Sequence, residues 1–316
     1  MNISLADAPR ISLLAGPTPV EEMSRLRAVL GGRGVPHLLV KRDDGIPFAF
    51  GGNKVRKLEF AMAAAMASGA DTIVTLGGVQ SNHARATAAA AAKMGLRCVL
   101  IINGAAQEKP TANALLDRLL GAEIQYIPSR NERAEASERI MTRLTASGRT
   151  PFLLPLGAST PVGALGFVAA VGELVEQGIR PDVIVHACSS GGTQAGLTAG
   201  VALHGLETRI IGVSADDPAA DVSATVRRIV RGIAGVESFD GSVDVDDSRV
   251  GEGYGVPTDA SREAQQLFAR TEALLVDHTY TAKAAGALIS YVREKRFGAD
   301  ETVLFWHTGG QVGLFA

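Results

Sequence analysis

Short, continuous apolar runs alternate with alanine-rich stretches of helical length along most of this 316-residue chain. The runs lack the polar–apolar alternation of half-exposed strands, which is typical of strands that have helices on both faces of their sheet. The pattern therefore predicts an α/β fold with mostly parallel sheets. The expected strands are Leu38–Lys41, Thr72–Leu76, Cys98–Ile102, Ile124–Ile127, Phe152–Leu154, Val183–Ala187, Ile210–Ser214 and Val303–His307. The expected helices are Val55–Ser68, Ser81–Met94, Thr111–Leu120, Glu132–Ala146, Val162–Glu176, Gly192–Leu203, Ser223–Ile233, Ser261–Thr271 and Ala282–Lys295.

Composition and length narrow the class of protein. The chain is long enough for two α/β domains or one large one, and two polar, Gly/Asp-rich stretches at residues 215–224 and 239–255 are predicted to be loops. A net charge of -2 argues against nucleic acid as a partner. We expect no secretory signal, no membrane span and no metal site. Cys98 and Cys188 lie in apolar runs and are expected to be buried free thiols, so the chain is predicted to be cytoplasmic.

A charged cluster, a loop and two glycines precede Lys54 in the stretch KRDDGIPFAFGGNKVRKLE. Two glycines beside a lysine favour a tight turn through which the backbone approaches a ligand closely. At a helix start the dipole disfavours a cation, which helps to keep the amine neutral and nucleophilic. A Schiff-base lysine needs this environment. The alternative is a solvated lysine at a helix start, which is the more common situation.

A second glycine-rich loop, from Ser189 to Thr193, follows an expected strand and precedes an expected helix. The unpaired N–H groups and the dipole of such a helix point at one spot and favour an anion there. The alternative is an ordinary turn in which Ser and Thr cap the helix. The loop has neither the spacing of a dinucleotide-binding fingerprint nor the lysine of a Walker loop.

Ser81, Asn82 and His83 follow two glycines at the end of another expected strand. Ser and Asn are good helix caps, so capping is one interpretation. The other places a hydroxyl and an amide at the carboxyl edge of a parallel sheet, where α/β proteins bind ligands. Tyr254 in GEGYGVP and Tyr280 in VDHTYTAKA offer the same choice between packing and a ligand site.

Stretches along nearly the whole chain resemble one family of pyridoxal-phosphate enzymes. They are PTPVEEM, GGNKVRKLEF, GGVQSNHARATAAAAAKMG, SSGGTQAGL, GEGYGVP, DHTYTAKAAGAL and HTGG. The family contains D-cysteine desulfhydrase, which the chain resembles most, L-cysteate sulfo-lyase and 1-aminocyclopropane-1-carboxylate deaminase. The resemblance implies fold type II, similar to the tryptophan synthase β subunit, with pyridoxal 5′-phosphate as cofactor. It also implies a small domain of residues 55–163 inserted in a large cofactor-binding domain of residues 1–54 and 164–316.

The resemblance also implies residue roles and a homodimer that acts on a small amino acid. The implied cofactor-binding residues are Lys54, Asn82, Ser190, Gly191, Gly192, Thr193 and Thr308. The implied substrate-binding residues are Ser81, Asn82, His83, Tyr254, Tyr280 and Thr281. The implied catalytic residues are Lys54, Ser81, Tyr254 and Tyr280. Thr308 and Thr281 are expected near the pyridine nitrogen, where a hydroxyl would not strongly hold that nitrogen protonated and so limits the ring as an electron sink.

Three functions stay open. The first is β-elimination, from D-cysteine to pyruvate, ammonia and hydrogen sulfide or from L-cysteate to pyruvate, ammonia and sulfite. The second is ring-opening deamination of the cyclopropane amino acid. Against it, the deaminases carry Glu, Leu and Gln where this chain has Thr281, Thr308 and His83. The third is a cofactor-binding protein without turnover, against which the intact Lys54, Ser81 and Tyr280 argue.

Overall fold

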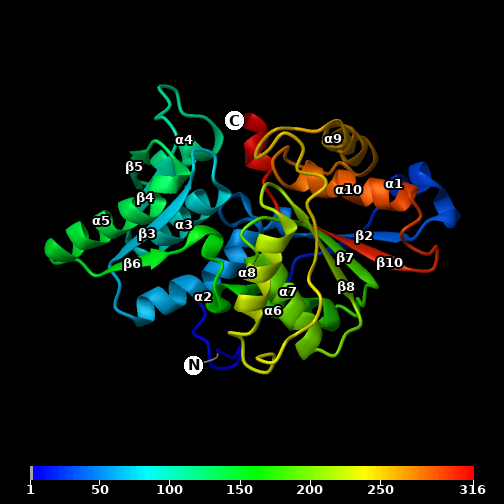
Figure 1. Ribbon diagram of the computed structural model, residues 1–316, viewed down its shortest axis with the longest axis horizontal. Helices are drawn as coiled ribbons and strands as arrows, with labels where there is room; N and C mark the ends of the chain where they lie inside the picture. Colours follow the sequence, from blue (N-terminus) through cyan, green and yellow to red (C-terminus); the bar gives the residue numbers. More distant parts are fainter. Residues whose placement is uncertain (1–2) are drawn as a thin grey trace.

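The computed structural model of the chain describes residues 3–316, and its strands form two sheets (Figure 1). The larger sheet has the order β1-β2-β10-β7-β8-β9, in which β1 runs antiparallel to β2 and the other neighbours are parallel. The smaller sheet, β5-β4-β3-β6, is parallel throughout. The strands are β1 (Val20–Glu22), β2 (His37–Arg42), β3 (Thr72–Gly78), β4 (Arg97–Asn103), β5 (Glu123–Ile127), β6 (Pro151–Leu154), β7 (Val183–Cys188), β8 (Arg209–Ser214), β9 (Asp244–Asp246) and β10 (Thr302–His307).

Helices cover both faces of each sheet (Figure 1). On the six-stranded sheet, α1, α9 and α10 pack on one face, and α6, α7 and α8 pack on the other. On the four-stranded sheet, α2 and α3 share one face and α5 takes the opposite one. The α-helices are α1 (Ser24–Leu30), α2 (Asn53–Ala67), α3 (Asn82–Met94), α4 (Ala112–Leu119), α5 (Arg133–Ala146), α6 (Pro161–Glu176), α7 (Gly192–Leu203), α8 (Ala219–Val230), α9 (Asp259–Glu272) and α10 (Thr281–Arg293). The 3₁₀ segments are η1 (Gly32–Gly34), η2 (Asp43–Gly45), η3 (Phe48–Phe50), η4 (Arg130–Glu132), η5 (Leu156–Ala158) and η6 (Gln311–Phe315).

The eight strands expected from apolar runs are all present, and the α/β class with parallel sheets is confirmed. The elements that the sequence missed, β1, β9 and α1, are short and carry polar residues. The loop prediction for residues 215–224 is wrong from Ala219 onward, because Pro218 supplies a φ of -58° at the start of α8. The loop prediction for residues 239–255 is wrong at β9, which pairs with β8 as an edge strand. Cys98 and Cys188 are buried free thiols, as expected.

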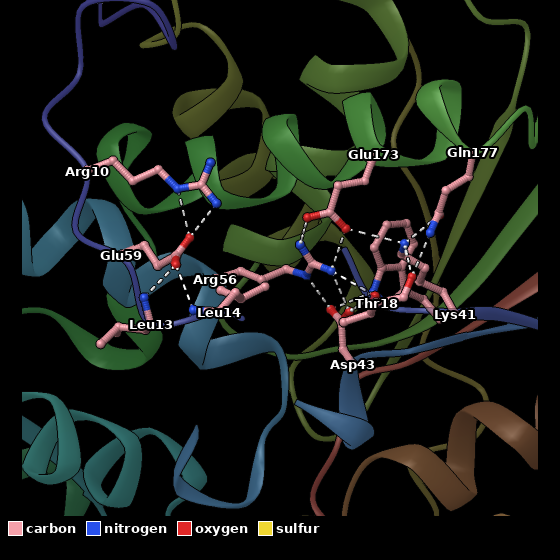
Figure 2. Close-up of polar contacts among 11 residues, drawn as sticks. Arg10, Leu13, Leu14, Thr18, Lys41, Asp43, Arg56, Glu59, Glu173 and Gln177 are labelled. Carbon is pink, nitrogen blue, oxygen red and sulfur yellow. Dashed lines mark hydrogen bonds and ion pairs between the residues drawn. The ribbon is translucent and has the colours of Figure 1, made fainter. Parts of the chain in front are cut away.

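Buried charges attach the start of α2 to the larger sheet (Figure 2). Arg56 donates two hydrogen bonds to the Asp43 carboxylate, one from Nε and one from Nη2, both at 2.8 Å. On its other side, the same guanidinium donates to Glu173 of α6 at 2.7 and 3.0 Å. Lys41 Nζ lies 3.3 Å from the Glu173 carboxylate. Two cations therefore meet two anions, so that each buried charge has a partner.

Asp43 uses its whole carboxylate in this network, which we call the Asp43 network. Besides the two bonds from Arg56, it accepts one from the Thr18 hydroxyl at 2.9 Å and one from Trp306 Nε1 at 2.8 Å. Its backbone carbonyl accepts from the N–H of Gly52 at 2.8 Å, just before α2 begins. The Asp43 network thus ties β2, β10, α6 and the turn before α2 to one point.

A second buried carboxylate fixes the other side of α2 (Figure 2). Glu59 accepts hydrogen bonds from the backbone N–H groups of Leu13 and Leu14 at 2.8 and 2.9 Å, and it pairs with Arg10 at 2.6 Å. The helix is therefore held from two sides. The division into domains at residues 55–163 stays a prediction. The four strands of the smaller sheet all fall within that range.

Removing one partner of the Asp43–Arg56 pair should lower the urea concentration at which the protein unfolds. Arg56→Met leaves a buried carboxylate without its guanidinium, which costs about 3–5 kcal/mol of stability. Arg262→Met is the control, because Arg262 pairs with Asp259 on the surface at 3.1 Å and such pairs contribute little. Urea titration monitored by circular dichroism measures both variants, and equal midpoints would contradict this role.

Candidate active site

A cavity of about 680 Å³ lies at the carboxyl ends of strands from both sheets. Gly78 and Asn103, which end β3 and β4, line it from the smaller sheet. Cys188 at the end of β7 and Thr308 after β10 line it from the larger sheet. Ligands of α/β proteins bind at such edges. The predicted residues that line this cavity are Lys54, Ser81, Asn82, His83, Ser190, Gly191, Thr193, Tyr254, Tyr280 and Thr308.

Two interlocked glycine turns present Lys54 to the cavity. Gly52 has a φ of +97°, and a Cβ there would lie 2.9 Å from the carbonyl oxygen of Thr308. A Cβ on Gly309 would lie 2.6 Å from the Cα of Gly52. The Asn53 N–H donates to the same Thr308 carbonyl at 3.0 Å. Only glycine permits both the positive φ and this close approach, so the GGNK and HTGG motifs form one structural unit.

The amine of Lys54 has no acidic partner among the described residues and donates to Asn53 Oδ1 at 3.1 Å. The pKa of Lys54 is lowered to about 8, chiefly by burial and also by the charge of Arg85, against an opposing effect of Cys188. A substantial neutral fraction therefore exists near neutral pH, which a nucleophilic amine requires. The alternative of a solvated surface lysine does not describe this side chain.

The loop from Ser189 to Thr193 meets the segment between β6 and α6. Ser190 Oγ lies 2.8 Å from Ser159 Oγ, and the Thr193 hydroxyl accepts from Asn53 Nδ2 at 2.9 Å. Gly192 does not line the cavity, and its N–H donates to the Ser190 carbonyl at 3.0 Å. Gly192 is needed for space, because a Cβ would lie 2.6 Å from Ser159 Oγ. The loop thus presents hydroxyls and the N-terminus of α7 to the cavity.

Lys57 is a buried lysine beside this loop that the sequence analysis does not single out. It lies one turn after Lys54 on α2, and its Nζ has one hydrogen-bond partner among the described residues, Ser159 Oγ at 3.4 Å. Burial and the charge of Lys54 lower the pKa of Lys57 well below its usual value. A phosphate between α7 and Lys57 would raise the pKa of Lys57 again and favour its charged form. The i, i+3 spacing from Lys54 is the signal that predicts a shared helix face.

The start of α3 also faces the cavity. The Ser81 hydroxyl accepts from the Ala84 N–H at 3.2 Å, which confirms its capping role. The N–H groups of Asn82 and His83 are in the first turn and have no acceptor among the described residues. The Asn82 side chain is held by Asn113 Nδ2 at 3.1 Å. These free N–H groups suit a carboxylate.

His83 lines the cavity as a neutral imidazole. Its Nε2 lies 2.9 Å from the Thr75 hydroxyl, which also donates to the Leu154 carbonyl at 2.8 Å. Burial, with the charges of Lys54 and Lys57, lowers the pKa of His83 well below its usual value.

Two tyrosines form a pair in the lining of the cavity. The Tyr254 and Tyr280 hydroxyls hydrogen-bond each other, and their rings pack edge to face at 5.7 Å between centroids. Burial and the neighbouring Tyr254 raise the pKa of Tyr280 well above its usual value, so Tyr280 keeps its proton. Lys283 holds the Tyr254 loop through the carbonyls of Val250 and Gly253, each at 2.8 Å.

Thr281 is not brought to the cavity, which corrects its predicted contact with substrate and with the pyridine nitrogen. It is the first residue of α10 and is fully buried. Its hydroxyl donates to Asp277 Oδ1 at 2.8 Å and accepts from the Asp277 N–H at 2.9 Å. Both hydrogen bonds of the Thr281 hydroxyl are therefore made with Asp277 at the start of α10. Of the two threonines, only Thr308 lines the cavity.

Charged residues that the sequence analysis does not single out also line the cavity. Arg130 pairs with Asp216 at 2.7 Å. Arg133 and Asp217 also line the cavity, and neither forms an ion pair with a described residue. Arg130 and Arg133 follow β5 of the smaller sheet, and Asp216 and Asp217 follow β8 of the larger sheet. Their spacing in the sequence therefore does not indicate that they line one cavity.

The chain is similar to known proteins of one enzyme family. The model of the family described as pyridoxal-phosphate dependent enzyme matches residues 11–309. The chain belongs to this family. D-cysteine desulfhydrase of Salmonella typhi is 39% identical over 98% of this chain and 96% of its own length. A solved ACC deaminase homologue has a TM-score of 0.91 and 32% identity, covering 98% of this chain and 94% of that one. Threonine deaminase isoform 2 from Solanum lycopersicum, with a TM-score of 0.68 and 15% identity over 97% and 81% of the two chains, shares the fold.

The cofactor of this pyridoxal-phosphate enzyme is pyridoxal 5′-phosphate, and the predicted fold type II is confirmed. The site fits that group: an amine with a lowered pKa and a helix N-terminus with hydroxyls line one cavity, and the buried Lys57 amine contacts Ser159, which in turn contacts Ser190 of the lining loop. Across residues 3–316, no group of His, Cys, Asp or Glu is arranged to hold a metal ion. No described helix is long and apolar enough to cross a membrane.

Lys54→Ala should remove the visible absorbance of the lysine-bound cofactor. Lys57→Met is the control and should keep that absorbance at saturating cofactor, because Lys57 is a buried lysine of the same helix. In the unmodified apoprotein, the rate at which the absorbance appears should rise with pH through about 8, where Lys54 loses its proton. Retention of the absorbance in Lys54→Ala would refute the assignment.

Lys57→Met should weaken binding of pyridoxal 5′-phosphate by roughly 10- to 100-fold, the scale of a hydrogen bond to a charged group. Binding of pyridoxal, which lacks the phosphate, should change little. Titrations of the apoprotein with both compounds measure the difference. An equal loss for the two compounds would show that Lys57 acts on the fold rather than on the phosphate.

Proposed function

We propose that this pyridoxal-phosphate enzyme catalyses β-elimination from a small β-substituted amino acid, with D-cysteine as the first choice. Water is consumed, and pyruvate, ammonia and hydrogen sulfide are released. The observation that carries the proposal is an amine of lowered pKa, Lys54, in one cavity with two separate anion-binding helix starts. The start of α7 suits the cofactor phosphate, and the start of α3 suits the substrate carboxylate.

The substrate would be oriented by the start of α3. Its carboxylate would accept from the free N–H groups of Asn82 and His83, with the Ser81 hydroxyl beside them. This contact fixes the substrate relative to Lys54, so that the Cα–H bond faces a nearby base. Bound pyridoxal 5′-phosphate supplies delocalisation of the electron pair left on Cα when its proton departs.

Two side chains would move the protons. Lys54, once its amine is free, takes the α-proton, and a pKa of about 8 suits a base that works near neutral pH. Tyr280 keeps its proton because its pKa is raised by burial and by the neighbouring Tyr254. Its hydroxyl would therefore be present as a hydrogen-bond donor to the departing sulfur, while Tyr254 orients it.

Elimination is favoured over ring opening by two residues that line the cavity. Thr308 and His83 stand where the resembling deaminases carry Leu and Gln. Thr281 does not line the cavity and therefore does not distinguish the two reactions. The desulfhydrase of Salmonella typhi, at 39% identity over 98% of the chain, supports D-cysteine as substrate. L-cysteate is the second candidate, because Arg133 lines the cavity without an acidic partner among the described residues.

The unmodified protein should release pyruvate from D-cysteine and form little 2-oxobutyrate from 1-aminocyclopropane-1-carboxylate. The reason is that expulsion of thiolate demands less of the ring than opening a cyclopropane. Coupled assays for the two keto acids on purified holoenzyme measure both, with Lys54→Ala as the inactive control. Efficient 2-oxobutyrate formation without pyruvate from any β-substituted amino acid would overturn the proposal.

We also propose that the protein is cytoplasmic and that it forms a homodimer. Two buried free cysteines suit a reducing compartment. Helix α4 packs against η6, and the neighbouring surface exposes Leu115, Leu119, Phe50 and Phe315. Exposed apolar side chains of this kind suit a protein–protein contact. Sedimentation of the purified protein measures its oligomeric state.

A further inference from the structure

Arg133 presents a guanidinium to the cavity whose charge is not neutralised by contact. It begins α5, lines the cavity and is half-buried. Its Nε and Nη2 both donate to Asn103 Oδ1, at 3.1 and 2.5 Å. Asn103 is neutral, so it orients one edge of the guanidinium without balancing its charge. Nη1 has no hydrogen-bond acceptor among the described residues.

The neighbouring charges do not provide the missing partner. Arg130 already neutralises Asp216 by the contact at 2.7 Å. Asp217 is within electrostatic range of Arg133, but no hydrogen bond or ion pair joins them in the described structure. Burial and the charge of Asp216 raise the pKa of Asp217. A carboxylate in a close ion pair would instead have a lowered pKa. Burial and Arg130 lower the pKa of Arg133, a cost that a bound anion would offset.

The other two anions of the complex have sites elsewhere. The cofactor phosphate is assigned to the start of α7 with Lys57, and the substrate carboxylate to the start of α3. Arg133 is on neither helix. It lines the same cavity as Tyr254 and Tyr280 and is within electrostatic range of both. It therefore lies on the side of the cavity where, in the proposed function, the leaving group departs.

We propose that Arg133 is a specificity residue that binds an anionic β-substituent of the substrate, a sulfonate above all. The inference rests on the proposed β-elimination and extends its substrate class from thiols to sulfonates. A planar guanidinium held at one edge offers its remaining N–H groups to two oxygens of a sulfonate. In the reaction, the Cβ–S bond breaks and its electron pair leaves with sulfur as sulfite, while the electron pair from the Cα–H bond forms the Cα–Cβ double bond. Hydrolysis then gives pyruvate and ammonia.

The charge of the substituent before reaction gives the proposal a sharp test. A sulfonate is anionic in the bound substrate, whereas the thiol of cysteine is largely neutral near pH 7. Loss of Arg133 should therefore raise KM for cysteate and leave KM for cysteine of the same hand unchanged. An effect on thiolate departure would appear in kcat instead. Comparing substrates of one hand removes any influence of stereochemistry.

The experiment measures pyruvate release by the holoenzyme from D-cysteine, D-cysteate, L-cysteine and L-cysteate. For Arg133→Leu we expect KM for the accepted cysteate to rise by roughly 10- to 100-fold, the scale of a lost hydrogen bond to a charged group. KM for cysteine should stay within about twofold, and Arg133→Lys should restore part of the cysteate affinity. Arg139→Leu is the matched control, because Arg139 is on the exposed side of the same helix.

Each result has one meaning. Equal changes in KM for cysteate and cysteine, no change for either, or pyruvate from cysteine but from neither cysteate would overturn the role of Arg133. Failure of the unmodified enzyme to release pyruvate from any of the four would refute the proposed function instead. In that event, the change in cofactor absorbance on adding cysteate or cysteine still tests Arg133. The proposal then stands only if Arg133→Leu selectively weakens cysteate binding.

Discussion

The buried contact between Arg56 and Asp43 is the interaction on which the arrangement of this enzyme depends. Asp43 directly follows β2, and Glu173 is in α6. Arg56 lies between them on α2, two residues after Lys54. Since successive helix positions differ by about 100°, Arg56 and Lys54 face nearly opposite directions. One side of the helix start is therefore clamped by charge while the other presents an amine. The attachment is rigid because a buried guanidinium that leaves its carboxylates would stay unpaired.

Much of the fold follows from the sequence because its strands are covered on both faces. Continuous apolar runs identified the eight principal strands, and glycines at strand ends identified the turns around Lys54, Ser81, Ser190 and Thr308. The elements missed, β1 and β9, lie at sheet edges, where burial imposes no apolar pattern. The local sequence therefore predicts those strands whose burial on both faces requires apolar residues.

The remaining parts of the site depend on packing over long sequence distances. Lys57 looks like an ordinary helical lysine until Ser159 and the α7 loop close over it. Arg133 becomes a cavity residue only because the two sheets direct their carboxyl edges toward a common space. Thr281 shows the converse: its motif matches the family, but its hydroxyl is committed to Asp277. A motif places a residue near a site, and hydrogen-bond partners decide whether it is free to act.

The position of β10 determines when this site can exist. This strand follows all others along the chain, yet it lies in the sheet between β2 and β7. It brings Trp306 to Asp43 and the Thr308 carbonyl to the turn before Lys54. During synthesis on the ribosome, the four strands of the smaller sheet emerge together and can pair early. The lysine emerges earlier still, but its turn gains its partners only when residues 302–308 arrive. The order of synthesis and the order of assembly of this turn therefore differ: the residue that reacts comes early, and the residues that hold its turn come about 250 residues later.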